Sequence, residues 1–147
     1  MGVGSIPQEP VRAEGAGTHV QGRERGGAAD GRPVDLARQA RGRFGEEQAA
    51  RWYRANGYTV VARNWRCATG EIDLVVIRDD TVVFVEVKAR ASDRFGSPAL
   101  AVDARKQARL RRLGAQWLAA HAHHRVDVRF DVVAVTGTRV EVIEAAF

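Results

Sequence analysis

Two apolar runs that flank a pair of aspartates constrain the fold of this chain more than any other feature. Residues 70–77 and 82–88 are rich in Val, Ile and Phe, which is typical of β-strands. Asp79 and Asp80 between them fit the two-residue loop of a β-hairpin. Because the length of such a loop fixes the register of two antiparallel strands, the residues that face each other follow directly.

The predicted register pairs residues of like character along the whole hairpin. In order from the turn, the expected pairs are Ile77 with Val82, Val75 with Phe84, Asp73 with Glu86, and Glu71 with Lys88. Side chains alternate along a strand, so these residues share one face, which is apolar near the turn and charged at the far end. The other face holds Ile72, Leu74 and Val76 and is apolar throughout.

The charged end of the hairpin is unfavourable as plain structure, because opposed like charges destabilise a sheet and buried charges need partners. A divalent cation between Asp73 and Glu86 would resolve this conflict. Lys88 is unusual too, since only Lys88 and Lys106 among 23 basic residues are lysine. Lysine is a compact point charge whose pKa shifts readily, whereas arginine stays protonated. The alternative is a structural cluster in which Glu86 and Glu71 both pair with Lys88.

The bulk properties predict one domain with an N-terminal tail. The chain has 147 residues, a net charge of +5 and a pI of about 10.3, which favours an anionic partner such as nucleic acid. Residues 1–34 are rich in Gly and Pro and lack periodic apolar residues, so we predict a disordered tail before a domain at 35–147. No run is long enough to span a membrane and only Cys67 is a cysteine, so we expect a cytoplasmic protein without membrane contact.

The periodicity of the domain predicts an α/β fold with the order αβββαββ and a mixed sheet flanked by helices. Beyond the hairpin, the expected elements are a helix at about 36–56, a strand at 58–64, a loop at 65–70, a loop at 91–98, a helix at 103–122, and strands at 126–136 and 139–144. Glu46, Ala49, Ala50 and Tyr53 lie on one face of the first helix.

The spacing of Asp73, Glu86 and Lys88 matches the PD-(D/E)xK pattern of metal-dependent nucleases, with Ile72 in place of the proline. In that chemistry two carboxylates and a main-chain carbonyl hold Mg²⁺ or Mn²⁺, and the metal activates a water and polarises the phosphate. The lysine orients the water or neutralises developing charge. We therefore predict that Asp73 and Glu86 bind the metal and that Lys88 is catalytic.

Other side chains are candidates for the same site or for nucleic acid. Glu46 is a candidate third metal ligand and catalytic carboxylate, although a glutamate near a helix start is also a common dipole partner. Lys106 and Gln107 lie early in the second helix, where either side chain could reach the same site, and Gln107 is a further catalytic candidate; the alternative is a solvated first turn. The predicted nucleic-acid contacts are Arg63, Arg66, Arg105, Lys106, Arg109 and Arg112, for which the alternative is a solvated surface.

Two further features, a tryptophan and a cluster of histidines, are explained better by a structural role than by ligand binding. Trp65, between two arginines, would stack on a base or fill the core. His121, His123 and His124 cluster where the second helix should end, and cationic side chains suit that position better than a metal site does.

Taken together, several motifs resemble those of the YraN family of small bacterial proteins, over residues 38 to 147. They are Gly42-Arg43-Phe44-Gly45-Glu46, Asn56-Gly57-Tyr58, Arg63-Asn64-Trp65-Arg66, Gly70-Glu71-Ile72-Asp73-Leu74, Phe84-Val85-Glu86-Val87-Lys88-Ala89-Arg90, Phe95-Gly96, Lys106, Arg129-Phe130-Asp131-Val132 and Ala145-Ala146-Phe147. The resemblance implies a restriction-endonuclease-like fold similar to that of archaeal Holliday-junction resolvases. It also implies that Glu46 joins Asp73, Glu86 and Lys88 at the active site.

The sequence thus predicts a nucleic-acid-binding protein that acts as a Mg²⁺-dependent endonuclease on structured or branched DNA. A branched substrate has two strands to cut, which makes a homodimer an expected partner arrangement. The first alternative is a non-catalytic nucleic-acid-binding module with the same fold, and the second is a protein-interaction scaffold.

Overall fold

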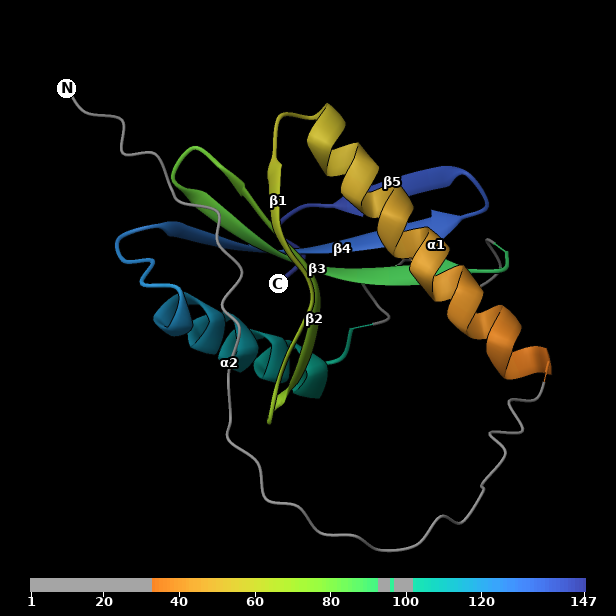
Figure 1. Cartoon of the computed structure of the whole chain (residues 1–147), viewed down its shortest axis with the longest axis horizontal. Coiled ribbons are helices and arrows are strands. Elements are labelled where there is room, and N and C mark those ends of the chain that lie inside the picture. Colours follow the sequence, from red (N-terminus) through yellow and green to blue (C-terminus); the bar gives the residue numbers. More distant parts are fainter. Residues whose placement is uncertain (1–32, 93–95, 97–101) are drawn as a thin grey trace, which may run out of the picture. The chain divides into compact units, whose positions relative to one another are not determined.

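The fold consists of a mixed five-stranded sheet with one helix packed on each face (Figure 1). The computed structural model describes residues 33–92, Gly96 and 102–147, so the predicted tail lies almost wholly outside the described residues. The elements are α1 (Pro33–Ala55), β1 (Thr59–Cys67), β2 (Gly70–Arg78), β3 (Thr81–Arg90), α2 (Ala104–Ala120), β4 (Asp127–Thr136) and β5 (Arg139–Ile143). The predicted α/β class and the order αβββαββ are confirmed.

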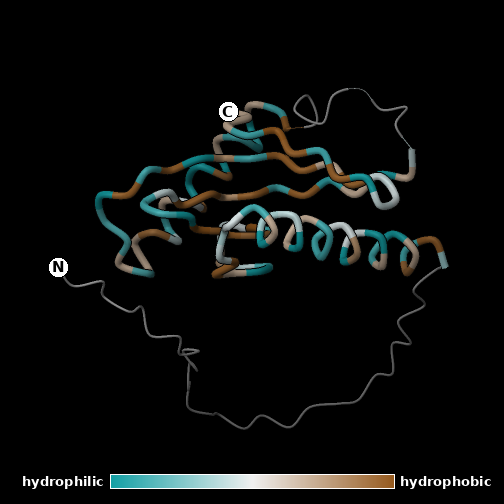
Figure 2. The backbone as a smooth tube through the Cα atoms, turned by 90° about the horizontal axis from the view of Figure 1, so that it is seen from above, coloured by the Kyte–Doolittle hydropathy of each residue, from teal (hydrophilic) through white to brown (hydrophobic). Residues whose placement is uncertain are grey.

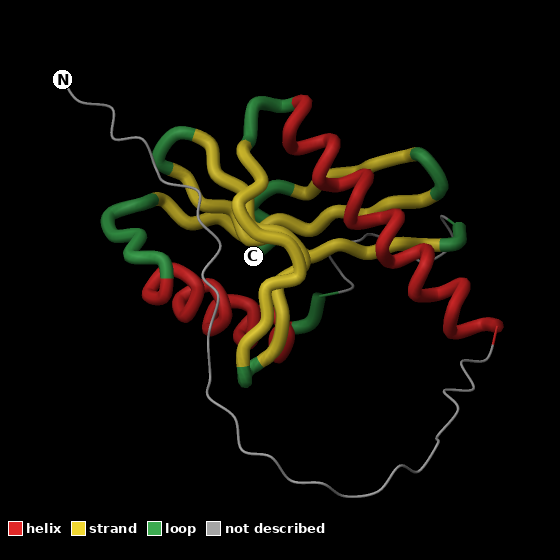
Figure 3. The backbone as a smooth tube through the Cα atoms, viewed as in Figure 1, coloured by secondary structure: helices red, strands yellow, loops and turns green. Residues whose placement is uncertain are grey.

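The strands lie side by side in the order of the chain, from β1 to β5. Only β3 and β4 are parallel, while the other three pairs are antiparallel. The connection from β3 to β4 passes through α2, as a parallel pair requires a long crossover. Figure 3 shows that β1 and β2 continue together, away from β3, at the end where β3 runs beside β4.

Each helix covers one face of the sheet because the strands alternate their side chains. Val83 and Val85 of β3 pack in a cluster with Ala49 and Tyr53 of α1. Their neighbours Val82 and Phe84 pack in a second cluster, which contains Leu110, Leu113 and Trp117 of α2. The central strands β2 and β3 are therefore buried on both faces over much of their length, and Figure 2 shows hydrophobic stretches, in brown, within the strands.

The helix boundaries follow from local signals. Pro33 opens α1, where its missing N–H costs nothing, and Asn56-Gly57 ends it with Gly57 at a φ of +83°. Asp103 caps α2 by accepting a hydrogen bond from the Lys106 N–H at 2.8 Å. Among the described ranges, neither helix is long and apolar enough to cross a membrane.

The structure corrects the predicted loop at 65–70. β1 continues to Cys67 and β2 begins at Gly70, so these strands form a second hairpin with Cys67 paired to Gly70. A register shift between Val60 and Ala62 interrupts the ladder between the two strands. Trp65 pairs with Ile72 and is partly buried against the cluster on the α2 face, which supports its structural role over base stacking.

A buried ion pair joins β4 to α1 and to the C-terminal residues. Asp131 is completely buried and accepts two hydrogen bonds from the Arg129 guanidinium, each 2.8 Å long. It also accepts one from the Tyr53 hydroxyl at 2.7 Å and one from the Ala145 N–H at 3.0 Å. With both carboxylate oxygens bonded, this network fixes α1 against the sheet.

Candidate active site

The candidate site lies where β2 and β3 separate. The observed ladder confirms the predicted register near the turn. It pairs Leu74 with Val85, Val75 with Phe84, Val76 with Val83, and Ile77 with Val82. The ladder between these strands ends at Leu74 and Val85, so the predicted pairs of Asp73 with Glu86 and of Glu71 with Lys88 do not form. Beyond this point β3 pairs with β4 as far as Arg90.

The Asp73 side chain replaces the main-chain pairing at the place where the ladder ends. Its Oδ2 accepts a hydrogen bond from the Val87 N–H at 2.7 Å. This contact holds the Asp73 carboxylate close to β3, although the two strands no longer pair there. The prediction that Ile72 shares a face with Leu74 is wrong, since Ile72 packs in the α2 cluster and Leu74 in the α1 cluster. The strict alternation of β2 is lost at the same place.

Glu86 is buried and holds two ammonium groups on a single oxygen. Its Oε1 lies 2.5 Å from the Nζ of Lys106 and 3.1 Å from the Nζ of Lys88. Only 7% of the Glu86 side chain is exposed, against 28% for each lysine. These are the only two lysines of the chain. Lys106, predicted to contact nucleic acid, thus belongs to the carboxylate cluster.

The Asp73 carboxyl is hard to ionise in this setting. Burial raises its pKa most, and the charges of Glu86 and Glu46 raise it further, while the Val87 hydrogen bond and Lys106 lower it. The balance brings the pKa of Asp73 to about 7, from an ordinary value of 3.8. The carboxylates of Asp73 and Glu86 repel each other in partly buried surroundings, and a cation bound between them would relieve this repulsion.

Glu46 reaches the same region from α1. Gly45 allows this approach, because a Cβ on Gly45 would lie 2.9 Å from the Cβ of Ala89 in β3. The Oε2 of Glu46 accepts a hydrogen bond from the Asn64 side chain at 2.9 Å. Its charge acts on Asp73, as the raised pKa shows. The predicted third carboxylate is therefore close enough to Asp73 for its charge to act on that carboxyl.

The carboxylates of the site suit a hard divalent cation that is held partly by water and substrate, rather than an ion enclosed by protein ligands alone. No three His, Cys, Asp or Glu side chains in the described ranges converge well enough to hold an ion by themselves. Mg²⁺ requires less, because it keeps several waters and commonly binds one or two carboxylates together with substrate phosphates. Asp73 and Glu86 supply two such carboxylates, and Glu46 adds negative charge nearby.

The glutamate at 71 has a different partner from the one predicted. Its Oε2 lies 2.8 Å from the Nε of Arg66, so Glu71 does not share Lys88 with Glu86. Arg63 is likewise paired, with its Nη1 2.8 Å from the Glu47 carboxylate. The predicted phosphate contacts Arg63 and Arg66 are thus exposed but already neutralised by neighbours.

The predicted basic face of α2 is present. Arg105, Arg109 and Arg112 line one open pocket of about 300 Å³ together with Asp103 and Lys106. Arg111 points elsewhere, over the Phe147 ring at 5.4 Å. Lys106 belongs both to this pocket and to the Glu86 ion pair, so the basic pocket adjoins the carboxylates.

Gln107 and the histidines lie outside the carboxylate cluster. The Gln107 side chain donates to the Val102 carbonyl at 3.0 Å, which fixes the start of α2. His121 and His123 stack on Trp117, with ring centroids 4.3 and 5.3 Å away. The imidazoles therefore cover the end of α2, and no contact in the described part of the chain places Gln107 among the reacting groups.

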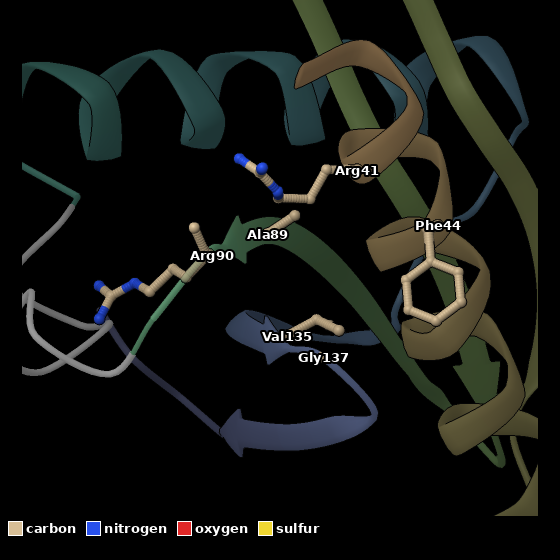
Figure 4. A pocket seen from close by; sticks show the side chains of 7 residues that line it. Arg41, Phe44, Ala89, Arg90, Val135 and Gly137 are labelled. Atoms are coloured by element: carbon tan, nitrogen blue, oxygen red, sulfur yellow. The ribbon is translucent and has the colours of Figure 1, made fainter. Parts of the chain in front are cut away.

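A second pocket opens beside the end of β3. Figure 4 shows Arg41 and Phe44 of α1 with Arg90 of β3 around it, together with Ala89 and Val135. Its volume is about 260 Å³, and Phe44 is 46% exposed. Arg90 follows Lys88 by two residues, so this pocket is a neighbour of the carboxylate cluster along β3.

Comparison with known proteins gives the family. Residues 45–135 match the family described as "Uncharacterised protein family UPF0102". The chain belongs to the UPF0102 family. This confirms the resemblance to the YraN family that the motifs predicted.

Relatives described as UPF0102 proteins match most of the chain. One from Beutenbergia cavernae is 56% identical over 103 residues, which cover 70% of this chain and 87% of the relative. One from Acidothermus cellulolyticus is 46% identical, with 76% and 96% covered, and one from Moorella thermoacetica is 44% identical, with 78% and 100% covered. The match to the family, over residues 45–135, spans the whole carboxylate cluster.

Sequence reasoning missed two features of the site. It predicted that Lys106 or Gln107 would reach the site and counted Lys106 among the phosphate contacts, but it did not identify Glu86 as the partner of Lys106. The rarity of lysine in the chain was the signal that linked Lys106 to Lys88. It gave Asp131 no role beyond a family motif. An acid between Phe130 and Val132 in an apolar strand was the available signal of a buried ion pair.

Proposed function

We propose that this protein is a Mg²⁺-dependent nuclease that hydrolyses a phosphodiester bond in structured DNA. The observation that carries the proposal is the cluster at the point where β2 and β3 separate: Asp73 bonds to the Val87 N–H, next to Glu86, and Lys88 lies 3.1 Å from Glu86. A raised pKa on one carboxyl beside another, with a lysine at hand, is the pattern expected of a catalytic site rather than of a stable core.

Asp73 and Glu86 would hold the ion, and Glu46 would add negative charge on the side of α1. When bound, a divalent cation polarises the scissile phosphate and lowers the pKa of a water. Lys88 lies on the same strand as Glu86, two residues further on, so its ammonium is positioned to orient that water or to stabilise negative charge on the phosphate. Hydrolysis adds the water oxygen to phosphorus and breaks one ester bond to a sugar.

The surroundings of the carboxylates suit DNA. The pocket of Arg105, Arg109 and Arg112 would bind phosphates on one side. The second pocket combines the exposed Phe44 ring with Arg41 and Arg90, which is the composition of a site where an unpaired base stacks while its phosphates are neutralised. A substrate with unpaired nucleotides would use both.

The test is incubation with duplex, single-stranded, flapped and four-way DNA in Mg²⁺, Mn²⁺ or EDTA. We expect metal-dependent cleavage of the branched or flapped DNA by wild type, and none by Lys88→Ala. Binding to the same DNA in Ca²⁺ should change little, because one charge among many is lost. Arg54→Ala, at an exposed arginine near the end of α1, is the matched control and should cleave normally. Equal cleavage by Lys88→Ala would refute the proposed mechanism.

Metal binding has a separate readout in thermal melting. Mn²⁺ should raise the melting temperature of wild type by mass action on the folded state, and should raise that of Asp73→Asn much less. Equal responses of the two proteins would show that the ion binds elsewhere.

The second candidate function is a DNA-binding module without catalysis. The two lysines on Glu86 favour it, because they already neutralise the carboxylate that a metal would use. DNA binding that weakens with salt, combined with no cleavage in any metal, would support this candidate. Changing Arg105, Arg109 and Arg112 to Gln should then reduce the slope of log K against log salt by about 0.9 per lost contact on duplex DNA.

A further inference from the structure

The two lysines of the chain compete with any cation for the Glu86 carboxylate. Lys106 and Lys88 both contact Oε1, at 2.5 and 3.1 Å, and the side chain they contact is nearly buried. Little water screens such charges, so their interaction is much stronger than that of a surface ion pair. A divalent ion on Glu86 would lie within a few ångströms of both ammonium groups, and like charges at that distance repel strongly.

The two lysines differ in where they can go. Lys88 is part of β3, where its backbone pairs with Ala134 of β4. Lys106 is on the first turn of α2, and its side chain lines the open pocket that also holds Arg105, Arg109 and Arg112. A rotation of the Lys106 side chain therefore exchanges a carboxylate partner for a place among three guanidinium groups.

That second place is favourable only when an anion is present. The pocket holds one carboxylate, Asp103, against three arginines, so the empty pocket repels a further cation, whereas a bound phosphate neutralises the arginines. A bound phosphate would also stabilise an ammonium beside it. Lys106 thus has a carboxylate partner when neither ligand is bound and a phosphate partner when both are.

We propose that Lys106 is a shared counter-ion that couples metal binding at Glu86 to phosphate binding on α2. The inference rests on the metal site proposed above and adds a regulatory role for a residue beside that site. Metal binding releases Lys106 towards the phosphate, and phosphate binding draws Lys106 away from the carboxylate. Each ligand therefore raises the affinity for the other by the same factor, as linkage requires. In the absence of DNA, Lys106 keeps metal affinity low.

The experiment uses Ca²⁺, in order to avoid cleavage, and a short flapped DNA as the phosphate probe. Ca²⁺ affinity is measured by calorimetry on the free protein, and DNA affinity by fluorescence anisotropy in EDTA and in saturating Ca²⁺ at constant ionic strength. Wild type is compared with Lys106→Gln and Lys88→Gln, each checked for folding by thermal melting. Lys106→Met serves as a second variant, because it keeps the apolar stem without a group that bonds Glu86 strongly.

We expect Ca²⁺ to bind free Lys106→Gln about ten-fold more tightly than wild type, with a ten-fold smaller enhancement of DNA binding by Ca²⁺. Lys88→Gln removes an equal charge from the same oxygen but does not line the pocket. It should also bind Ca²⁺ more tightly and should keep the enhancement. Equal enhancement in wild type and in both Lys106 variants would overturn the inference and leave the nuclease proposal standing. Ca²⁺ binding to none of the proteins would overturn both.

Discussion

Neutralising Asp73 should stabilise the metal-free protein, and the gain should depend on pH. Asp73→Asn removes the charge, while the amide oxygen of asparagine is still able to accept the Val87 hydrogen bond. The repulsion from Glu86 and Glu46 and the cost of burying a charge disappear together. Function would be lost in exchange for stability, as is common at active sites.

The magnitude follows from the pKa of Asp73, which stands at about 7 in the folded protein against an ordinary value of 3.8. Below pH 3.8 the group is protonated in both states, so it has no effect on stability. Between 3.8 and about 7 only the unfolded chain releases the proton, and the folded state loses stability as pH rises until the loss levels off above 7. At 1.36 kcal/mol per pKa unit, the loss is about 2 kcal/mol at pH 5 and about 4 kcal/mol at pH 8.

The assay is urea unfolding of wild type and Asp73→Asn in EDTA at pH 5, 6.5 and 8. The difference in free energy of unfolding between the two proteins should grow with pH, by up to about 2.5 kcal/mol from pH 5 to pH 8. Titrating groups far from Asp73 cancel in this difference. Asp80→Asn, at an exposed turn residue, is the control and should show a small difference that does not vary with pH. A constant difference for Asp73→Asn, or a loss of stability at pH 8, would refute the reasoning.

Three further changes test the core and the surface. Asp131→Ala should cost about 3–5 kcal/mol in urea unfolding, because it leaves a guanidinium and a phenol without their buried partner; Glu144→Ala, at the exposed end of the network, should cost under about 1 kcal/mol. Gly114→Ala would bring a Cβ to 2.9 Å from the Phe84 ring. It should lose about 1–3 kcal/mol by overpacking, and a neutral result would show that α2 moves away freely. Phe44→Ala should weaken binding to DNA with unpaired bases by about 1–3 kcal/mol and leave duplex binding unchanged; an equal loss on duplex would argue against stacking.

Local sequence signals determined the elements and part of the hairpin. The spacing of Ala49, Ala50 and Tyr53 predicted the buried face of α1, and Asp103 predicted the start of α2. The register next to the Asp79-Asp80 turn was also predictable, because a two-residue loop leaves little choice over the first few pairs. These features depend on residues that are close in the chain.

The pairing at the far end of the same hairpin depends on strands outside the hairpin. Beyond Val85, β3 continues with β4, and β2 continues with β1, so the two strands of the hairpin separate. Each strand keeps the ladder on its other edge, since β1 pairs with β2 down to Gly70 and β4 pairs with β3 as far as Arg90. Asp73 therefore bonds to the Val87 N–H instead of facing Glu86 in a ladder.

The charge partners of the site were decided by tertiary structure alone. The sequence named Asp73, Glu86 and Lys88 by their spacing on one hairpin. It also predicted that Lys106 or Gln107 would reach this site, but not which acid either side chain would contact. That Lys106 contacts Glu86 depends on where α2 packs, which the cluster of Leu110, Leu113 and Trp117 fixes against the opposite face from α1. Apolar packing is not directional along the chain, so spacing in the sequence carries no record of which side chains a packed helix brings together.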